Sequence, residues 1–356
     1  MENTNLFADN EKLIKEFGAS KISQIKNLPN IKYFRNGLVY SHRDFDKFFR
    51  ALEKGEKCAI VSGVNASGVL HLGHKAVFDI NLFFQRKYNI PVFIPISDDE
   101  SYVAGKVKSQ EEALRNSLEL AKDMLAYGFD PNKTFFIIDQ IYTNIYNLAI
   151  KLSKKINYSE IKATYGYKAE ENIGLHFYPA VQSAHILLPQ EKFGIKNVLV
   201  PIGPDEDPHL RICRDIASRF NYEKPSVIHV RFLEGIDGEK MSKSKDNAIF
   251  LREDIGIVRK KVMKALSGGR KTIEEHRKFG GNPDVDMSFK YLKYFFLEDS
   301  KSLEDKYKKG EILSSEMKNY LLEHLIPFLE NFQRNLKNIK KEEIEKCILK
   351  NNNFLL

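Results

Sequence analysis

The 356-residue sequence contains no tryptophan, only three cysteines and no run of 18 apolar residues. Cys58, Cys213 and Cys347 lie far apart and form no CxxC pair, which excludes a disulfide framework and a four-cysteine zinc site. The missing apolar run excludes a segment that spans a bilayer, and the first residues lack the basic and apolar regions of a signal peptide. These absences predict a cytoplasmic protein with no membrane partner.

The charge is positive but modest, with 56 Lys and Arg against 48 Asp and Glu, a net charge of +8. Residues 1–50 carry nine basic and six acidic side chains, residues 51–250 carry 25 of each, and residues 251–356 carry 22 and 17. A neutral centre between basic ends suggests that the ends contact a polyanion, although solvated helical faces give the same pattern. The length predicts about two domains, and the 42% hydrophobic content excludes a disordered chain.

Short apolar runs alternate with longer amphipathic stretches in the middle of the chain. Runs rich in β-branched and aromatic residues predict strands over 58–62, 92–97, 135–139, 198–202 and 227–232. Three- and four-residue spacing predicts helices between them, over 76–88 and 110–127. This alternation predicts an α/β fold with a doubly wound parallel sheet, whose ligands bind at the carboxyl ends of the strands.

The ends of the chain have a different pattern. After residue 254 we expect helices over 288–297, 314–335 and 340–350, which predicts an α-helical C-terminal domain. The first 50 residues are expected to form an appended segment with two helices. The predicted division is therefore 1–50, 51–253 and 254–356.

The first chemical motif follows the first predicted strand, from Ser62 to Lys75. Gly63 and Gly73 let backbone approach a ligand closely, and His71 and His74 stand at a helix start, where the helix dipole favours phosphate. The spacing fits neither a dinucleotide fingerprint nor a Walker loop. A metal site would need further ligands, and a purely structural histidine pair is the plainer alternative.

The second motif is Lys240-Met241-Ser242-Lys243-Ser244, which follows two glycines. Two lysines in a glycine-flanked loop can stabilise the negative charge that spreads over a polyphosphate in a transition state. A lysine–serine run without other motifs is usually a solvated loop. The chemical interpretation therefore depends on the first motif.

Together the two motifs resemble the HxGH and KMSKS signatures of class I aminoacyl-tRNA synthetases. Further segments look like tryptophanyl-tRNA synthetases of the archaeal and eukaryotic type, and the match runs in order from about Lys57 to Gln333. The Ser267 to Asp286 stretch is the most discriminating, since tyrosyl enzymes do not carry it. These segments are Asp98-Asp99-Glu100, Tyr178 to Gln182, Gly203 to His209, and Ser267-Gly-Gly-Arg270 with Asp284-Val-Asp286.

The resemblance implies a tryptophan–tRNA ligase. Such enzymes condense L-tryptophan with ATP and Mg²⁺ to an aminoacyl adenylate and pyrophosphate, and then charge the 3′ end of tRNA(Trp). It also implies a class I, Rossmann-like catalytic domain with a helical insertion at about residues 100–195, an α-helical anticodon-binding domain and a homodimer. No protein-bound zinc is expected.

The resemblance also assigns roles to individual residues. Two acidic side chains, Glu298 and Asp299, are candidates for contact with the anticodon. Catalytic roles fall on His71, His74, Lys240, Lys243 and Ser244, and ATP contacts on Gly63, His71, Gly73, His74, Lys240, Met241, Ser242 and Lys243. The amino-acid site would comprise Val61, Ser62, Pro95, Glu100, Gln182, Asp205 and Glu206.

Three of these positions depart from the family pattern. Glu206 stands where the family usually has glutamine, so it keeps an acceptor, loses a donor and adds charge. Val61 and Pro95 stand where the eukaryotic enzymes place the tyrosine and the glutamine that recognise the indole N–H. The sequence alone therefore leaves open which group binds the indole nitrogen.

Three alternatives follow from these features. A tyrosine–tRNA ligase is favoured by Val61 and Pro95 but disfavoured by the C-terminal motif. A tRNA-binding relative without catalytic activity is disfavoured by the intact His71, His74, Lys240 and Lys243. A small nucleotidyltransferase of the HxGH kind would not need the large helical C-terminal region.

Overall fold

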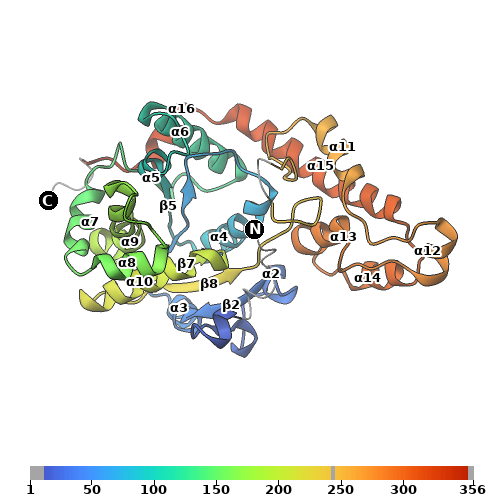
Figure 1. Cartoon of the computed structure of the whole chain (residues 1–356), viewed down its shortest axis with the longest axis horizontal. Coiled ribbons are helices and arrows are strands. Elements are labelled where there is room, and N and C mark those ends of the chain that lie inside the picture. The colour runs from blue at the N-terminus through green and yellow to red at the C-terminus, as the bar shows by residue number, and fades with distance from the viewer. Residues whose placement is uncertain (1–11, 242–244, 352–356) are drawn as a thin grey trace.

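The computed structural model describes residues 12–241 and 245–351, and it shows an α/β body joined to a set of helices (Figure 1). Five parallel strands form the centre of the body, in the spatial order β8, β7, β3, β5, β6. The short strand β4 (Val64–Asn65) also pairs with β5. The five strands are β3 (Cys58–Val61), β5 (Val92–Ser97), β6 (Thr134–Ile138), β7 (Asn197–Ile202) and β8 (Ser226–Val230).

The order of the strands confirms the predicted doubly wound sheet. From β3 the chain moves outward to β5 and β6, and then returns to place β7 on the other side of β3. The residues of β3 and β5 are all buried, as expected for strands that are covered on both faces. The winding direction therefore reverses between β3 and β7, and such a reversal opens a crevice at the carboxyl ends of the two strands.

Helices cover the sheet between the strands. Helix α6 matches its predicted range, with Ser109 as N-cap and Gly128 in a left-handed conformation after its last residue. Helix α9 contains Pro179 and Pro189 and packs against α7 and α10. These helices are α4 (Lys75–Tyr88), α5 (Asp98–Val103), α6 (Gln110–Tyr127), α7 (Ile145–Ser153), α8 (Tyr158–Tyr165), α9 (Ile173–Phe193) and α10 (Asp207–Arg219).

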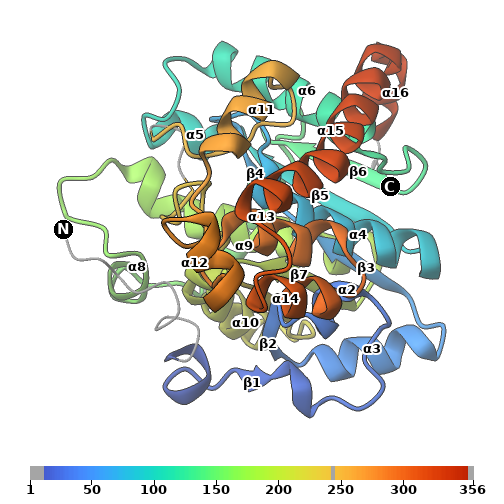
Figure 2. The same ribbon diagram turned by 90° about the vertical axis from the view of Figure 1, so that its right-hand side faces the viewer.

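The N-terminal segment joins the sheet. It contains the helices α2 (Lys32–Arg35) and α3 (Phe45–Glu53), but also β1 (Ser20–Lys21) and β2 (Val39–Arg43), which the sequence did not predict. Strand β2 pairs antiparallel with β8, and β1 pairs with β2, so they form one edge of the sheet (bottom of Figure 2). The partner of β2 lies almost 190 positions away in the chain, so local patterns cannot show this pairing.

The C-terminal region is helical. Its long helix α15 packs against α6, α11 and α13, and the chain then returns to the sheet, where Leu349 N–H donates to Phe136 O of β6 at 2.9 Å. The predicted helix over 288–297 is α13 followed by a π-helical turn, Leu292–Phe296. The region comprises α11 (Ile255–Lys264), α12 (Ile273–Phe279), α13 (Met287–Tyr291), α14 (Lys301–Lys308), α15 (Ser314–Asn338) and α16 (Lys341–Cys347).

Within the described residues, no helix is both long and apolar enough to cross a membrane. The division of the chain at residues 50 and 253 stays a prediction. The first of these positions falls inside α3.

Candidate active site

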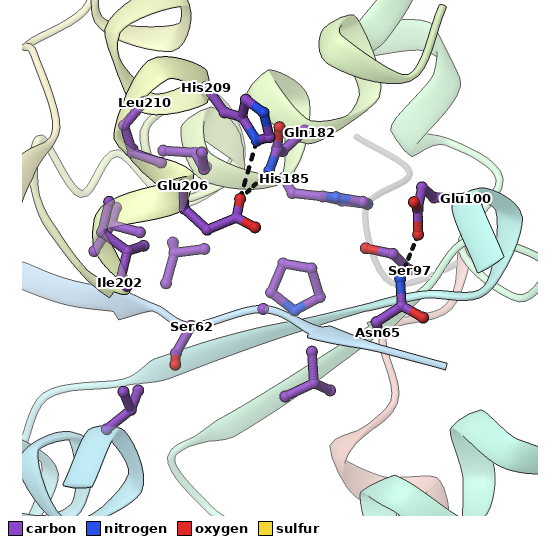
Figure 3. Close-up of a pocket in the computed structure, with 18 of the residues that line it drawn as sticks. Ser62, Asn65, Ser97, Glu100, Gln182, His185, Ile202, Glu206, His209 and Leu210 are labelled. Carbon is purple, nitrogen blue, oxygen red and sulfur yellow. Dashed lines mark hydrogen bonds and ion pairs between the residues drawn. The ribbon is translucent and has the colours of Figure 1, made fainter. Parts of the chain in front are cut away.

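A cavity of about 430 Å³ lies at the carboxyl ends of β3 and β7, where the winding of the sheet reverses. Its size is typical of sites for small molecules. Figure 3 shows side chains of α9 and α10 facing the ends of the strands across this cavity. The predicted residues that line it are Val61, Ser62, Gly63, Gly73, His74, Pro95, Glu100, Gln182 and Glu206.

The HxGH motif forms a short 3-10 turn, Leu72–His74, directly before α4. His71 Nδ1 accepts from Gly73 N–H at 3.2 Å, so Nε2 carries the ring proton and can donate to an anion. The rings of His71 and His74 lie 4.2 Å apart between centroids. The turn therefore places two imidazoles at the N-terminus of a 14-residue helix, where phosphate binding is favoured.

Gly73 is enclosed by groups from both signature motifs. A Cβ atom at this position would lie 2.9 Å from the His71 ring and 3.3 Å from Met241 Sδ. A side chain here would therefore displace His71, which explains the requirement for glycine. The short distance to Met241 also shows that the beginning of the KMSKS loop lies close to the HxGH turn.

Lys240 lies beside the predicted amino-acid site. Its Nζ is 4.8 Å from the centroid of the Phe232 ring, and its charge acts on Asp205. Burial, then the charge of Glu206, raises the pKa of Asp205, while Lys240 opposes this shift. Neither Lys240 nor Asp205 is among the residues that line the cavity, and Ser242, Lys243 and Ser244 lie outside the described residues.

One wall of the cavity carries a chain of hydrogen bonds around Glu206. His209 Nδ1 lies 3.0 Å from Glu206 Oε2, and Gln182 Nε2 donates to the same oxygen at 3.4 Å (Figure 3). Tyr165 donates to Gln182 Oε1 at 2.9 Å and stacks on His209, with ring centroids 4.0 Å apart. Burial favours the neutral acid, but His209, Gln182 and Lys106 hold the pKa of Glu206 below its usual value. Glu206 is therefore a carboxylate held at the cavity wall.

Glu100 lies on the opposite side of the cavity, at the start of α5. Lys106 Nζ contacts Glu100 Oε1 at 2.7 Å, and Asn65 donates to its other oxygen. Both carboxylate oxygens of this predicted ammonium ligand are therefore already bonded within the chain. The Ser62 hydroxyl, in contrast, points away from Gln182 and Glu206 in Figure 3.

A cluster of acids lies next to the cavity, formed by Asp98, Asp99 and Asp139, whose oxygens fall within 4.8 Å of one another. Asp98 accepts from Asp139 N–H at 2.8 Å and from the Gln140 side chain at 2.8 Å. His185, which lines the cavity, lies with Nε2 2.7 Å from Asp139 Oδ1. Burial, together with Asp139, raises the pKa of Asp99 to about 8. Asp99 therefore keeps a proton at neutral pH.

Asp99→Asn is expected to stabilise the protein more at pH 8 than at pH 5. In the folded state the pKa of Asp99 is about 8 against 3.8 in the unfolded chain, so the unfolded state binds fewer protons between these values. The stability of the wild type therefore falls as pH rises through this range. The asparagine side chain cannot ionise, so the variant does not have this pH dependence. Urea unfolding of both proteins at pH 5 and pH 8 measures the difference. An equal difference in the free energy of unfolding at both pH values would contradict the raised pKa of Asp99.

Several residues of the cavity were missed in the sequence, although some had a usable signal. His185 follows Gln182 by three residues on α9, a spacing that places two side chains on one helix face. His209 follows Glu206 by the same distance. Lys106 had no such signal, because it reaches the cavity from the loop after α5. The other missed residues include Asn65, Ser97, Tyr165, Tyr167 and Tyr178.

The two candidate anticodon residues are both involved in contacts within the chain. Glu298 forms an ion pair with Arg35 of α2, and its side chain is largely exposed. Asp299 Oδ1 accepts from Lys301 N–H at 2.9 Å, at the start of α14. Their role in tRNA binding stays a prediction.

Comparison with known proteins places this cavity in context. The model of the family described as "tRNA synthetases class I (W and Y)" matches residues 53–330. A curated relative from Saccharolobus solfataricus, named tryptophan–tRNA ligase, is 38% identical over 348 residues, which covers 94% of this chain and 90% of that protein.

Solved structures agree with this relationship. The tryptophanyl-tRNA synthetase of Aeropyrum pernix K1 superposes with a TM-score of 0.88 and 33% identity, and the match covers 96% of this chain and 97% of that one. The tryptophanyl-tRNA synthetase of Plasmodium falciparum gives a TM-score of 0.87 and 35% identity, and the match covers 96% of this chain and 98% of that one.

Proposed function

The chain belongs to the family of class I tRNA synthetases for tryptophan and tyrosine, and on this premise we propose that it acts as a tryptophan–tRNA ligase. It activates L-tryptophan with ATP to tryptophanyl adenylate and pyrophosphate, and transfers the aminoacyl group to the 3′ end of tRNA(Trp). The curated relatives that match nearly the whole chain carry this activity in their names, which supports tryptophan over tyrosine as the substrate.

One observation carries the proposal. A single cavity joins the HxGH turn at one end to the Glu206 and Gln182 wall at the other. The first is suited to phosphates and the second to an ammonium group, so ATP and an amino acid can bind next to each other. A protein that binds tRNA without catalysis would not need the two ends in one cavity.

The reaction needs no general base from the protein, because the carboxylate of the substrate is itself the nucleophile that attacks the α-phosphate. The chain contributes positioning and charge stabilisation. His71 and His74 would donate to phosphate oxygens, and Lys240 with Lys243 would stabilise the departing pyrophosphate. Met241 and Gly73, which lie close together, would pack beside the nucleotide. Mg²⁺ would arrive bound to the phosphates of ATP, as is usual for this ion.

Glu206 and Gln182 would bind the substrate ammonium. Glu206 is a carboxylate at the cavity wall, and His209 fixes its orientation through the 3.0 Å contact. Glu100 already forms an ion pair with Lys106, so its contribution to ammonium binding would be smaller than that of Glu206. The distribution of contacts therefore favours Glu206 as the principal charged partner.

Glu206→Gln is expected to raise the KM for tryptophan about 5- to 30-fold with a smaller change in kcat. A hydrogen bond to a charged group contributes about 1 to 2 kcal/mol more than a neutral one can, and this contact is present before and during the reaction. Steady-state pyrophosphate exchange measures both constants. Glu170→Gln, an exposed carboxylate between α8 and α9, is the matched control and should change neither. An unchanged KM in Glu206→Gln would contradict the role.

The helical C-terminal region and the basic N-terminal segment would contact tRNA, with Glu298 and Asp299 near the anticodon. We also propose a homodimer, for which the mass in solution would be twice 41.2 kDa. We propose that the protein acts in the cytoplasm.

The proposed activity is tested by ATP–pyrophosphate exchange with each of the twenty amino acids in turn. Tryptophan should support exchange, and tyrosine should support it at least a hundredfold less well, as about 3 kcal/mol of discrimination would give. Exchange with tyrosine alone would transfer the assignment to the tyrosine ligases. Absence of exchange with every amino acid would refute the enzyme assignment.

A further inference from the structure

The apolar part of the cavity requires a partner for the indole N–H of tryptophan. Val61 at the end of β3 and Pro95 in β5 line this part, and neither side chain carries a hydrogen-bonding group. A buried N–H without a partner would cost about 1 to 3 kcal/mol, a factor of about 5 to 150 in affinity. A specific tryptophan site therefore needs an acceptor from another element.

His185 stands in the right place to supply it. It lies on α9 one turn after Gln182, is buried, and lines the cavity. In Figure 3 its ring lies between Gln182 and Ser97, on the side of the helix that faces the strands. Its Nε2 lies 2.7 Å from Asp139 Oδ1, so the ring is held in a fixed orientation.

The acid cluster determines which ring nitrogen carries the proton. Asp139 Oδ2 has no hydrogen-bond partner in the described part of the chain, and the Asp99 carboxyl group lies beside that of Asp139 in the acid cluster. Two adjacent buried carboxyl groups share a proton rather than both ionising. Asp99, whose pKa is raised to about 8, holds this proton, which leaves Asp139 as the ionised member of the pair and its Oδ1 as an acceptor. His185 therefore donates from Nε2–H, and its Nδ1 carries a lone pair.

Burial also keeps this ring neutral. It lowers the pKa of His185 to about 4, although the carboxyl groups of Asp99 and Asp98 oppose the shift. A neutral ring with Nε2–H has one acceptor, Nδ1, and no hydrogen bond to Nδ1 is found among the described residues. His185 thus presents an acceptor that the chain itself does not use.

Several other polar groups around the cavity are bonded to one another. Ser97 Oγ and Tyr178 OH lie 2.9 Å apart, and Tyr165 donates to Gln182. His209 is bonded to Glu206. Each of these groups is already held by a contact within the chain, whereas His185 Nδ1 accepts no hydrogen bond from the described residues.

We propose that His185 Nδ1 accepts the indole N–H of bound tryptophan and so selects tryptophan over side chains of equal size that lack this donor. This role rests on the proposed tryptophan ligase activity. The His185 acceptor would take the place of the tyrosine and glutamine side chains of the eukaryotic enzymes, because this chain has Val61 and Pro95 at those two positions. Asp139 acts as a positioning residue that sets the tautomer of His185.

The test compares tryptophan with 3-benzothienylalanine, in which sulfur replaces the indole N–H with little change of shape. In pyrophosphate exchange the wild type should prefer tryptophan about 10- to 100-fold in kcat/KM. His185→Leu should reduce this preference to about 3-fold or less. His185→Asn, which keeps an acceptor at the δ position, should retain part of it. His324→Leu, at a histidine of α15 that does not line the cavity, is the control and should keep the full preference.

The outcomes separate the two proposals. No exchange with tryptophan in the wild type would refute the ligase activity itself. Exchange with tryptophan and with the benzothienyl analogue at equal efficiency would refute only the role of His185. An undiminished preference in His185→Leu would do the same.

A second measurement covers the case in which His185→Leu does not fold, because it needs only the wild type. Tryptophan labelled with ¹⁵N in the indole ring should show a downfield-shifted, slowly exchanging N–H proton when bound to the enzyme. A bound N–H resonance at the position of free tryptophan would contradict the proposal.

Discussion

His74→Ala is expected to lower kcat for ATP–pyrophosphate exchange about 100- to 1,000-fold, because one donor to a developing negative charge contributes this much in comparable sites. Its affinity for tryptophan should change less than about threefold, since the amino acid binds at the Glu206 end of the cavity. His74 lies at the N-terminus of α4 and lines the cavity, so its removal takes a donor from the phosphate end alone.

Affinity can be measured independently of catalysis because the chain contains no tryptophan. Bound tryptophan is the only indole, and its fluorescence reports binding directly. His324→Ala is the matched control, since this half-buried histidine of α15 does not line the cavity. A loss of tryptophan affinity as large as the loss of rate in His74→Ala would contradict the assignment to the phosphates. Lys243→Ala should show the same separation of rate from affinity.

Asp207→Ala is expected to lower the free energy of unfolding by about 3 to 5 kcal/mol, the usual cost of removing one partner from a buried ion pair. Asp207 is fully buried at the start of α10. Its carboxylate accepts from Arg43 Nε at 2.6 Å and Arg43 Nη2 at 2.8 Å, and His229 Nε2 lies 2.9 Å away. The pair connects α10 to β2 and β8, so the variant leaves a buried guanidinium without its partner.

The same ion pair makes stability depend on pH. Burial alone would raise the pKa of Asp207, but His229 and Arg43 hold it well below its usual value. A carboxylate with a depressed pKa stabilises the fold above the unfolded-state pKa of 3.8, and this contribution is lost as pH falls below that value. Urea unfolding at pH 7 and pH 3 should therefore show a smaller difference between variant and wild type at pH 3.

Asp215→Ala provides the control for this experiment. Asp215 lies on the same helix but is exposed, so its replacement should change stability by less than about 0.5 kcal/mol. A loss of under 1 kcal/mol in Asp207→Ala would show that the buried pair does not stabilise the junction of α10 with β2 and β8.

The sheet could be predicted where its signals are local. The strands β3 to β8 of the parallel sheet, apart from the two-residue β4, are mostly apolar runs with clear boundaries, and their alternation with helices predicts that they are parallel. Strand β2 has no such signal, because the sequence Val39 to Arg43 mixes apolar and polar residues and gains its stability from β8. The π-helical turn at Leu292–Phe296 likewise depends on packing against α15 rather than on spacing.

The residues of the candidate site likewise differ in how far the sequence could predict them. Motif residues such as Gly73, Gln182 and Glu206 could be predicted because their spacing is fixed by the reaction that the resemblance implies. The spacing places His185 on the same helix face as Gln182, but its role could not be predicted, since it depends on Asp139, directly after β6, and on Asp99 of α5, which come together only in the folded chain. The bonding of Glu100 to Lys106 is also a property of the fold alone.

The most direct test of the ligase activity is the ATP-dependent charging of a tRNA(Trp) transcript with radiolabelled amino acids by the wild-type protein. We expect labelled tryptophan to be attached to the 3′ end, while labelled tyrosine is not attached to tRNA(Trp) or tRNA(Tyr). Charging of tRNA(Tyr) with tyrosine, or no charging of tRNA(Trp) with tryptophan, would contradict the assignment.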